Sequence, residues 1–363
     1  MTSETTRVLV INPGTTSTKL GIYSREGAEW ERNITHGDEE LARFSGQPML
    51  ARLDYRSELI ERALEEAGHK STTFAAVAGR GGLLRPTTCG TYLVDEDMLE
   101  ELRLARQGEH ASNLGAFLAL RFAQAAGVNA YIVDPVTVDE WQECARLSGL
   151  PHVKRVCIAH ALNIKAVARR FAREQRKPYE SLRLIIVHMG SGITVSAHRD
   201  GSMIDGNSIE EGPFGPDRTG SLPVKALVKL CFSGQFTQAQ LQRQVFGDGG
   251  IFAYLGTRDL KEVERRIAAG DAKAAQVFDA MVYQIAKEVG AMAAVLEGKV
   301  NSMLLTGGMA YSEKIVKRLS DSVSWIAPIV VYPGENELQA LAEGAFRVLN
   351  NEERAKTLGP LPL

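Results

Sequence analysis

Two segments of the sequence carry residue types that bind phosphate. The first reads Asn12-Pro-Gly-Thr-Thr-Ser-Thr-Lys19 and the second reads His188-Met-Gly-Ser-Gly192, and a run of aliphatic residues precedes each. Glycine lets the backbone approach a ligand closely, and small hydroxyl residues leave backbone N–H groups free for phosphate oxygens. The residues expected to contact a nucleotide are Gly14, Thr15, Thr16, Ser17, Lys19, His188, Gly190, Ser191 and Gly192.

Both segments continue in the same way along the chain. Alternating apolar and polar residues follow each glycine, and then a turn of arginine, an acid and glycine, at residues 25–27 and 199–201. This pattern predicts a β-hairpin. One such loop on its own is usually only a tight turn. Because the whole pattern occurs twice, it favours two related domains that hold one nucleotide from opposite sides.

Predicted strands and helices alternate along the chain, which indicates an α/β fold. Strands are expected at 74–78, 130–133, 301–305 and 329–332, and helices at 53–68, 95–106, 112–126, 158–173, 273–296 and 337–349. The length of 363 residues favours two domains. We expect an N-terminal acid-substrate domain at 1–150, with residues from about 340 to 363 packing back on it, and a nucleotide-binding domain at 151–339.

Composition excludes several classes of protein. The formal charge is −2 with no basic block, so a nucleic-acid partner is not expected. The four cysteines are widely spaced, a pattern of reduced thiols rather than of a zinc site. Residues 1–6 are polar, and no apolar run is long enough to span a membrane. The sequence therefore predicts a cytoplasmic protein without a membrane partner.

Two arginines lie among glycines in segments that read as loops. Arg80 follows a predicted strand in Gly79-Arg-Gly-Gly82, and Arg218 lies in Phe214-Gly-Pro-Asp-Arg-Thr-Gly220. The planar guanidinium group suits both carboxylate and phosphoryl oxygens, although a surface salt bridge is the usual fate of an arginine. Both loops favour the functional interpretation.

The order of these motifs resembles the acetokinase family, within the superfamily of acetate and sugar kinases, heat-shock chaperone ATPases and actin. The two phosphate segments carry the resemblance, together with Asp134 after a strand and Thr306-Gly-Gly308. Three further stretches resemble the butyrate kinase branch: Gly79-Arg-Gly-Gly-Leu-Leu84, His160-Ala-Leu-Asn163 and Glu210-Glu-Gly-Pro-Phe-Gly-Pro-Asp-Arg-Thr-Gly220. The resemblance covers nearly the whole chain. It implies two related domains of the actin-like ATPase (duplicated ribonuclease H-like) fold with an interdomain cleft.

The resemblance also implies an activity, which is phosphoryl transfer from ATP, with Mg²⁺, to a short-chain carboxylate such as butyrate. A carboxylate is already ionised at pH 7, so the reaction needs positive charge and positioning rather than a general base. By the same resemblance the catalytic residues are Asn12, Arg80, Asp134, His160 and Arg218, and Arg80, His110 and Arg218 contact the acid. Asp259, Gly307, Gly308 and Met309 are assigned to the nucleotide, and Glu337 to the metal with Glu335 as its alternative.

Other interpretations remain open. Acetate, propionate or a branched acid could be the substrate, because each buried methylene contributes only about 0.8 kcal/mol. A kinase of a hydroxyl substrate and a chaperone-like or actin-like ATPase fit the sequence less well. His160 could be a core histidine and Asp134 a turn former, and His36, His69, His152 and His198 are expected at the surface. The family further suggests a homodimer or a higher homo-oligomer.

Overall fold

The chain divides into two compact units. The computed structural model describes residues 6–69 and 74–360. Unit 1 comprises Met1–Asp139 and Asn336–Leu363, and unit 2 comprises Glu140–Glu335. Of the C-terminal segment expected to pack on the first domain, residues 361–363 lie outside the described part of the chain.

Unit 1 is built on a six-stranded mixed sheet of strand order β3-β2-β1-β4-β6-β5. The strands β1 (Val8–Pro13), β2 (Ser17–Ser24) and β3 (Gly27–Thr35) are antiparallel neighbours. The strands β4 (Ala76–Arg80) and β6 (Asn129–Val133) continue the sheet in parallel with β1. The short strand β5 (Thr91–Leu93) closes the edge antiparallel to β6.

Unit 2 is built on a five-stranded sheet of order β11-β10-β7-β8-β9. The strands β7 (Leu184–Met189), β8 (Ile193–Arg199) and β9 (Ser202–Gly206) form an antiparallel meander. The strands β10 (Ser302–Gly307) and β11 (Ile329–Pro333) run parallel to β7. When the sheet of unit 2 is listed from the other edge, as β9-β8-β7-β10-β11, its order and strand directions match those of β3-β2-β1-β4-β6 in unit 1.

The two meanders correspond residue by residue. Val8 pairs with Tyr23 in the first, and Leu184 pairs with His198 in the second. The pairing of the second strand with the third shifts at Tyr23 in one sheet and at His198 in the other. The equivalence places Asn12 and His188 at matching positions, each at or near the end of the strand that leads into a phosphate loop.

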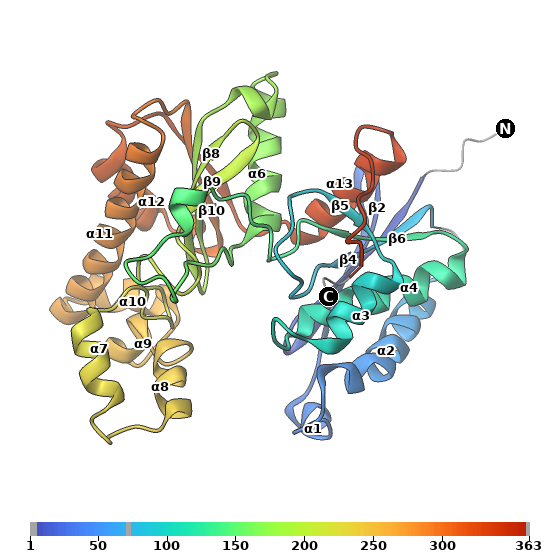
Figure 1. Cartoon of the computed structure of the whole chain (residues 1–363), viewed down its shortest axis with the longest axis horizontal. Coiled ribbons are helices and arrows are strands. Elements are labelled where there is room, and N and C mark those ends of the chain that lie inside the picture. Colours follow the sequence, from blue (N-terminus) through green and yellow to red (C-terminus); the bar gives the residue numbers. More distant parts are fainter. Residues whose placement is uncertain (1–5, 70–73, 361–363) are drawn as a thin grey trace. The chain divides into compact units, whose positions relative to one another are not determined.

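Two helices cover the sheet of unit 1 from opposite faces (Figure 1). Arg80 pairs with Val133 in the sheet, and Gly79 pairs with Ile132. Gly79 faces α4 (Leu114–Ala126), where a Cβ atom would lie 2.2 Å from the Gly115 carbonyl oxygen. Val133 faces α13 (Glu337–Leu349), whose Gly344 lies against its side chain. Small residues thus let both helices approach the sheet closely, α4 at β4, which carries Arg80, and α13 at the neighbouring β6.

Unit 2 has the same layered plan. The longest helix, α11 (Ala272–Val295), packs on the face formed by Ile185, Val187 and Met303. The helix α6 (Ala161–Glu174) packs on the other face, formed by Ile186 and Leu304. Aliphatic residues alternate between the two cores because successive side chains of a strand point to opposite faces.

Other helices complete the two units. In unit 1 they are α1 (Asp38–Ala42), α2 (Leu53–Glu66) and α3 (Glu96–Leu104). In unit 2 they are α5 (Glu143–Arg146), α7 (Val224–Cys231), α8 (Gln238–Val245), α9 (Gly250–Leu255), α10 (Leu260–Ala268) and α12 (Glu313–Val323). None of the helices within the described residues is long and apolar enough to cross a membrane.

Residues 140–150, assigned in the sequence to the first domain, pack with unit 2. Trp141 shares a small buried cluster with Cys157 and Met203. Glu140 forms an ion pair with the fully buried Lys165 at 2.5 Å. These contacts move the unit boundary to the bond between Asp139 and Glu140.

Candidate functional site

The first phosphate loop, residues 14–17, is a tight turn between β1 and β2. The Gly14 N–H donates to the Ser17 carbonyl at 2.7 Å. Thr15 and Thr16 are exposed. Within the described chain, neither of their N–H groups donates to a backbone carbonyl, so both are available to an anion. Lys19 is exposed on β2, and its cross-strand partner is Asn12.

Asn12, Arg80 and Glu337 form one cluster in unit 1, here called the arginine–glutamate cluster. The Asn12 Nδ2 donates to Glu337 Oε2 at 2.7 Å, and Arg80 Nη1 donates to Glu337 Oε1. The side chains of Arg80 and Glu337 are 19% and 14% exposed. Three elements distant in sequence therefore meet here: the end of β1, the end of β4 and the start of α13.

The backbone around Arg80 is held by close approaches at glycines. A Cβ atom on Gly115 would lie 2.1 Å from the Arg80 carbonyl oxygen, and one on Gly81 would lie 2.6 Å from the Pro135 Cβ. A Cβ on Gly82 would lie 2.7 Å from the Asn113 Cα. A side chain at any of these positions would displace the backbone around Arg80, so the three glycines are needed for the observed position of Arg80 at the end of the strand.

Asp134 lies directly after β6 in a left-handed conformation, with φ 38°. Its carboxylate is buried, and Oδ1 accepts from the Gly90 N–H at 2.7 Å. A left-handed conformation is unfavourable for a residue with a Cβ and is concentrated at functional sites. Aspartate tolerates this conformation in turns as well, so the functional role of Asp134 stays a prediction.

His110 caps a 3₁₀ turn, Ala111–Asn113, and its Nδ1 lies 2.8 Å from the Ser112 hydroxyl. Desolvation and the nearby charge of Arg80 lower the pKa of His110. Arg80, whose charge acts on His110, also belongs to the arginine–glutamate cluster.

In unit 2 two histidines lie face to face beside the second phosphate loop, residues 190–192. The rings of His160 and His188 have centroids 3.9 Å apart and planes inclined by 13°. The Nδ1 of His160 lies 3.0 Å from the Thr194 hydroxyl. His188 Nε2 lies 3.1 Å from Glu335 Oε1. A Cβ on Gly190 would lie 2.9 Å from that same oxygen, so Glu335 borders the loop.

Asn163 fixes the tautomer of His188. Its Nδ2 contacts His188 Nδ1 at 2.9 Å and donates to the Thr306 hydroxyl at 3.1 Å. An amide nitrogen can only donate, so His188 Nδ1 accepts and the ring proton lies on Nε2. Asn163 was visible in the sequence within His160-Ala-Leu-Asn163, but nothing in the sequence assigned it a role.

Arg218 lies against the second phosphate loop. A Cβ atom on Gly192 would lie 2.4 Å from Arg218 Nη1 and 3.3 Å from His160 Cε1. The Nη1 is buried and has no hydrogen-bond partner within the described residues. A buried guanidinium N–H without a partner is costly, and an anion bound at the loop would satisfy it.

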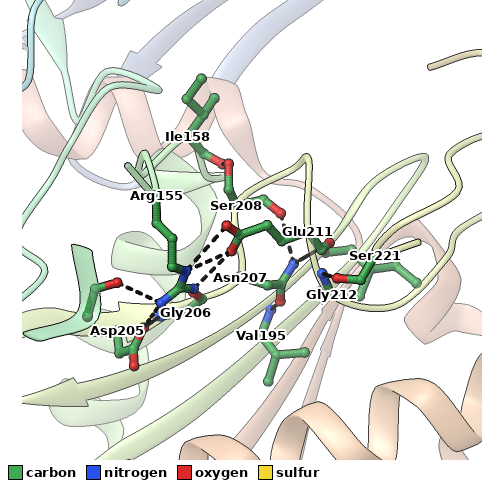
Figure 2. Close-up of polar contacts among 12 residues, drawn as sticks. Arg155, Ile158, Val195, Asp205, Gly206, Asn207, Ser208, Glu211, Gly212 and Ser221 are labelled. Atoms are coloured by element: carbon green, nitrogen blue, oxygen red, sulfur yellow. Dashed lines mark hydrogen bonds and ion pairs between the residues drawn. The ribbon is translucent and has the colours of Figure 1, made fainter. Parts of the chain in front are cut away.

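The segment that carries Arg218 is tied to the hairpin by Asn207 (Figure 2). Asn207 is 1% exposed, and its Oδ1 accepts from the Val195 N–H at 2.7 Å. Its Nδ2 donates to the Ile193 carbonyl at 2.7 Å and to the Ser208 carbonyl at 3.1 Å. Further along, the Gly212 N–H donates to the Ser221 hydroxyl at 3.0 Å. One buried amide thus joins the strand after the phosphate loop to the start of the arginine segment.

Arg155 anchors the same segment from the other side. It contacts Glu211 through both Nε and Nη2, and Nη2 also donates to the Gly206 carbonyl at 2.7 Å (Figure 2). Its guanidinium lies 4.6 Å from the centre of the Trp141 ring. The segment 206–223, which carries Arg218, is therefore held by internal hydrogen bonds and by Arg155.

The expected nucleotide residues occupy two places in unit 2. Gly307 ends β10 with φ 90°, and a Cβ there would lie 2.3 Å from the Met189 carbonyl oxygen. Gly308 and the buried Met309 begin the next turn. Asp259 caps α10, accepting from the Lys261 N–H at 2.9 Å. Asp259 thus has a local structural role, and no contact joins it to Gly307 among the described residues.

Two of the histidines expected at the surface are buried. His36 is 2% exposed and contacts Thr18, and His198 is fully buried between Tyr179 and Ser196. The expectation for both was wrong: Thr18 and Tyr179, which lie in other elements than the histidines they contact, each contribute a hydrogen-bond partner.

Comparison with known proteins places these residues in context. The model of the acetokinase family matches residues 152–343. The chain is 46% identical over 352 residues to "Probable butyrate kinase" of Clostridium botulinum, covering 96% of this chain and 99% of the relative. It is 47% identical over the same length to "Butyrate kinase 1" of Clostridium acetobutylicum, with the same coverage.

Solved structures resemble the fold. The acetate kinase of Porphyromonas gingivalis matches with a TM-score of 0.80 at 17% identity, over 95% of this chain and 100% of that one. A propionate kinase from Francisella tularensis matches with a TM-score of 0.72 at 15% identity, over 93% and 98%. These likenesses confirm the predicted two-domain, duplicated α/β fold.

Proposed function

Because the chain belongs to the acetokinase family, we propose that it transfers the terminal phosphoryl group of ATP to butyrate, giving butanoyl phosphate and ADP. The identity of 46–47% to butyrate kinases over 96% of the chain carries this proposal. The protein is thus a phosphotransferase that uses a carboxyl group as acceptor.

The reaction needs few bond changes. One carboxylate oxygen of butyrate attacks the γ-phosphorus, the bond from that phosphorus to the β,γ-bridging oxygen breaks, and ADP leaves with the electron pair. A carboxylic acid with a pKa of about 4–5 is already ionised at neutral pH, so no proton moves. The barrier is the approach of one anion to another, which fixed positive charge lowers.

We assign that positive charge to Arg80 and Arg218. The unpartnered Nη1 of Arg218, beside Gly192 of the second loop, supports a contact with a phosphoryl oxygen. Arg80 is held by Glu337, and its position at the end of β4 supports a contact with the acid or the transferred group. His110 would then bind the acid beside Arg80.

The nucleotide is assigned to unit 2. The second loop supplies Gly190, Ser191 and Gly192, with His188 beneath it, and Gly307 and Gly308 admit adenosine close to the backbone. His160 would donate a hydrogen bond to the transferring group. In unit 1, Asn12 and the N–H groups of residues 14–17 would contact phosphate, and Asp134 would orient the substrate.

Magnesium is expected to arrive with ATP and to neutralise part of the phosphate charge. Mg²⁺ usually takes one or two protein carboxylates together with phosphates and water. The described residues contain no group of three or more His, Cys, Asp or Glu side chains that could hold an ion alone, which fits a metal held partly by the nucleotide. We propose Glu337 as its carboxylate, released from Arg80 when ATP binds. The alternative, Glu335, belongs to the other unit and already contacts His188.

Phosphorylation of a different short-chain acid is the second candidate, since the fold is shared with acetate and propionate kinases. Discrimination between neighbouring acids is expected to be modest, because each methylene contributes about 0.8 kcal/mol.

A hydroxamate assay tests both candidates. Purified protein with ATP and Mg²⁺ is given butyrate, propionate, acetate, glycerol or no acceptor, and ADP release is measured in parallel. We expect acyl hydroxamate with butyrate at a higher kcat/KM than with acetate, and little ADP without an acid. An equal or higher kcat/KM for acetate would overturn the specificity, and rapid ADP release without an acceptor would overturn the reaction class.

A further inference from the structure

A fully buried arginine lies directly behind the first phosphate loop. Arg56 belongs to α2, is 0% exposed, and reaches the loop across about forty residues of sequence. Its Nη2 donates to the carbonyl of Gly14 at 2.8 Å and to that of Thr15 at 3.3 Å. Its Nη1 donates to the Thr18 hydroxyl at 3.0 Å and to the Ser17 carbonyl at 3.4 Å.

With one further backbone hydrogen bond, these contacts give each of the four carbonyl oxygens of the loop, residues 14–17, a hydrogen-bond donor. The Thr16 carbonyl, which Arg56 does not reach, accepts from the His36 N–H at 2.9 Å. With all four carbonyl oxygens turned to the protein side, the N–H groups of Thr15 and Thr16 are left to face the other way. A run of outward amides is an anion-binding arrangement.

The charge of Arg56 has no carboxylate partner. Among the described residues no acid forms an ion pair with it, and the charge of the neighbouring Arg52 further disfavours its charged form. Burial, and then Arg52, lower the pKa of Arg56 to about 10, so the guanidinium stays charged at pH 7. A buried charge without a counter-charge is strongly unfavourable. A phosphate bound on the far side of the loop would supply the missing negative charge.

The surrounding hydrogen bonds keep this charge in place without neutralising it. Arg56 donates to the Thr18 hydroxyl, which donates to His36 Nε2 at 2.9 Å. His36 Nδ1 then donates to the Tyr55 hydroxyl at 3.3 Å, which donates to Glu40 at 2.9 Å. Burial lowers the pKa of His36 to about 4, so this histidine of the hydrogen-bonded series is neutral at pH 7. Along these hydrogen bonds, the carboxylate of Glu40 is separated from Arg56 by three uncharged groups.

We propose that Arg56 is the positioning residue of the first phosphate loop: it turns the loop carbonyls inward and provides, through the loop, the counter-charge for a bound phosphoryl group. The inference rests on the proposed function for the identity of that ligand as ATP. The proposal gives α2 an indirect role in phosphate binding, because Arg56 acts from behind the loop.

The test compares three variants. Arg56→Lys keeps the charge and loses hydrogen bonds, and Arg56→Gln loses both. Arg121→Gln is the matched control, because Arg121 also docks on α2, donating to Ser57 at 2.7 Å and pairing with Asp54 at 2.7 Å. For each, we measure the Kd of Mg–ATP by calorimetry, the KM values for ATP and butyrate, and the melting temperature.

We expect Arg56→Gln to weaken Mg–ATP binding about 100-fold and Arg56→Lys about 10-fold, the effect of losing charge-assisted hydrogen bonds. The KM for butyrate should change less than about threefold in both, and Arg121→Gln should bind Mg–ATP like the unaltered protein. If Arg56 were only structural, its loss would lower the melting temperature and would affect ATP binding and the KM for butyrate to similar extents.

Two outcomes overturn the proposal: Mg–ATP binding within about threefold of the unaltered protein in both Arg56 variants, or failure of both to fold, which would assign Arg56 to stability. Failure of the proposed function is distinguishable. It appears as absence of acyl hydroxamate in the unaltered protein, whereas the binding comparison needs no turnover.

Discussion

The imidazole ring of His160 stacks on that of His188, and each ring is held through its Nδ1 atom. Thr194 contacts the first ring at 3.0 Å and Asn163 the second at 2.9 Å. The pair therefore forms one oriented layer beside Gly190 and Gly192, built from the start of α6 and from β7.

We expect His160→Ala to lower kcat by about tenfold, because a neutral donor stabilises developing charge less than a cation does. The KM for ATP should rise as well, since the ring also supports His188 beneath the second loop. Steady-state kinetics with butyrate and ATP measure both. A loss as large as that for the arginines would mean that His160 acts as more than a neutral donor.

Arg80→Ala and Arg218→Ala should each lower kcat by about 100-fold or more, as expected when a charge that stabilises the transition state is removed. Arg103→Ala, on the exposed end of α3, serves as the control and should leave kcat unchanged. Circular dichroism checks folding. Losses of tenfold or less in both variants would show that other residues supply the charge.

The close approach of Gly115 to Arg80 predicts an indirect effect on catalysis. Gly115→Ala places a methyl group 2.1 Å from the Arg80 carbonyl oxygen, so the strand and α4 must move apart. We expect a loss of about 1–3 kcal/mol in the free energy of unfolding, as for other overpacked sites, together with a lower kcat.

Gly290→Ala is the matched control for that change. Gly290 also lies within a helix, α11, but nothing stands within 4 Å of a Cβ built there. Alanine should raise the free energy of unfolding by up to about 1 kcal/mol and leave kcat as it is. Urea denaturation and kinetics on both variants measure the contrast, and equal effects would contradict it.

Two buried histidines predict a dependence of stability on pH. Burial, ahead of the charge of Arg56, lowers the pKa of His36 to about 4, and burial holds the pKa of His198 well below its usual value. An unfolded chain binds these protons near pH 6.5, so each histidine's contribution to stability is complete above that pH and is lost as the pH falls toward the folded-state pKa.

Between pH 7 and pH 5 His198 should lower the stability in the same direction, and the loss from His36 should be about 2 kcal/mol, measured by urea denaturation at the two values. His36→Gln should reduce the difference by about that amount. His152→Gln, at an exposed position, should leave the difference unchanged. A difference in His36→Gln equal to that of the unaltered protein would contradict the assignment.

The repeated hairpins were predictable because their signal is local. Alternation and the closing turn define β1–β2 and β7–β8, and the equivalence of Asn12 and His188 follows from that repeat. The strands and longer helices were predicted to within a few residues for the same reason. The identities to butyrate kinases confirm the predicted family and reaction class.

Other features depend on partners distant in sequence. Nothing in the sequence assigned a role to Arg56, and only the fold brings it behind the loop. The burial of His198 depends on Tyr179, which lies in a different element. From the sequence we did not predict the helices α7 to α10 and α12, nor the strand β5, which with three residues is too short to show a period. The roles assigned to the site residues stay predictions until the variants are measured.

The discontinuity of unit 1 has a consequence for biosynthesis. The chain leaves unit 1 after Asp139 and returns at Asn336, and α13, which covers one face of the first sheet, lies in the returning segment (Figure 1). On the ribosome, unit 2 is therefore translated in full while the face around Val133 is still bare and Arg80 still lacks Glu337. Since domains fold as they emerge from the ribosome, unit 2 can fold first. Until α13 is synthesised, one apolar face of the sheet in unit 1 stays exposed. A chaperone that binds such surfaces has its longest opportunity on this protein during those roughly two hundred residues of translation.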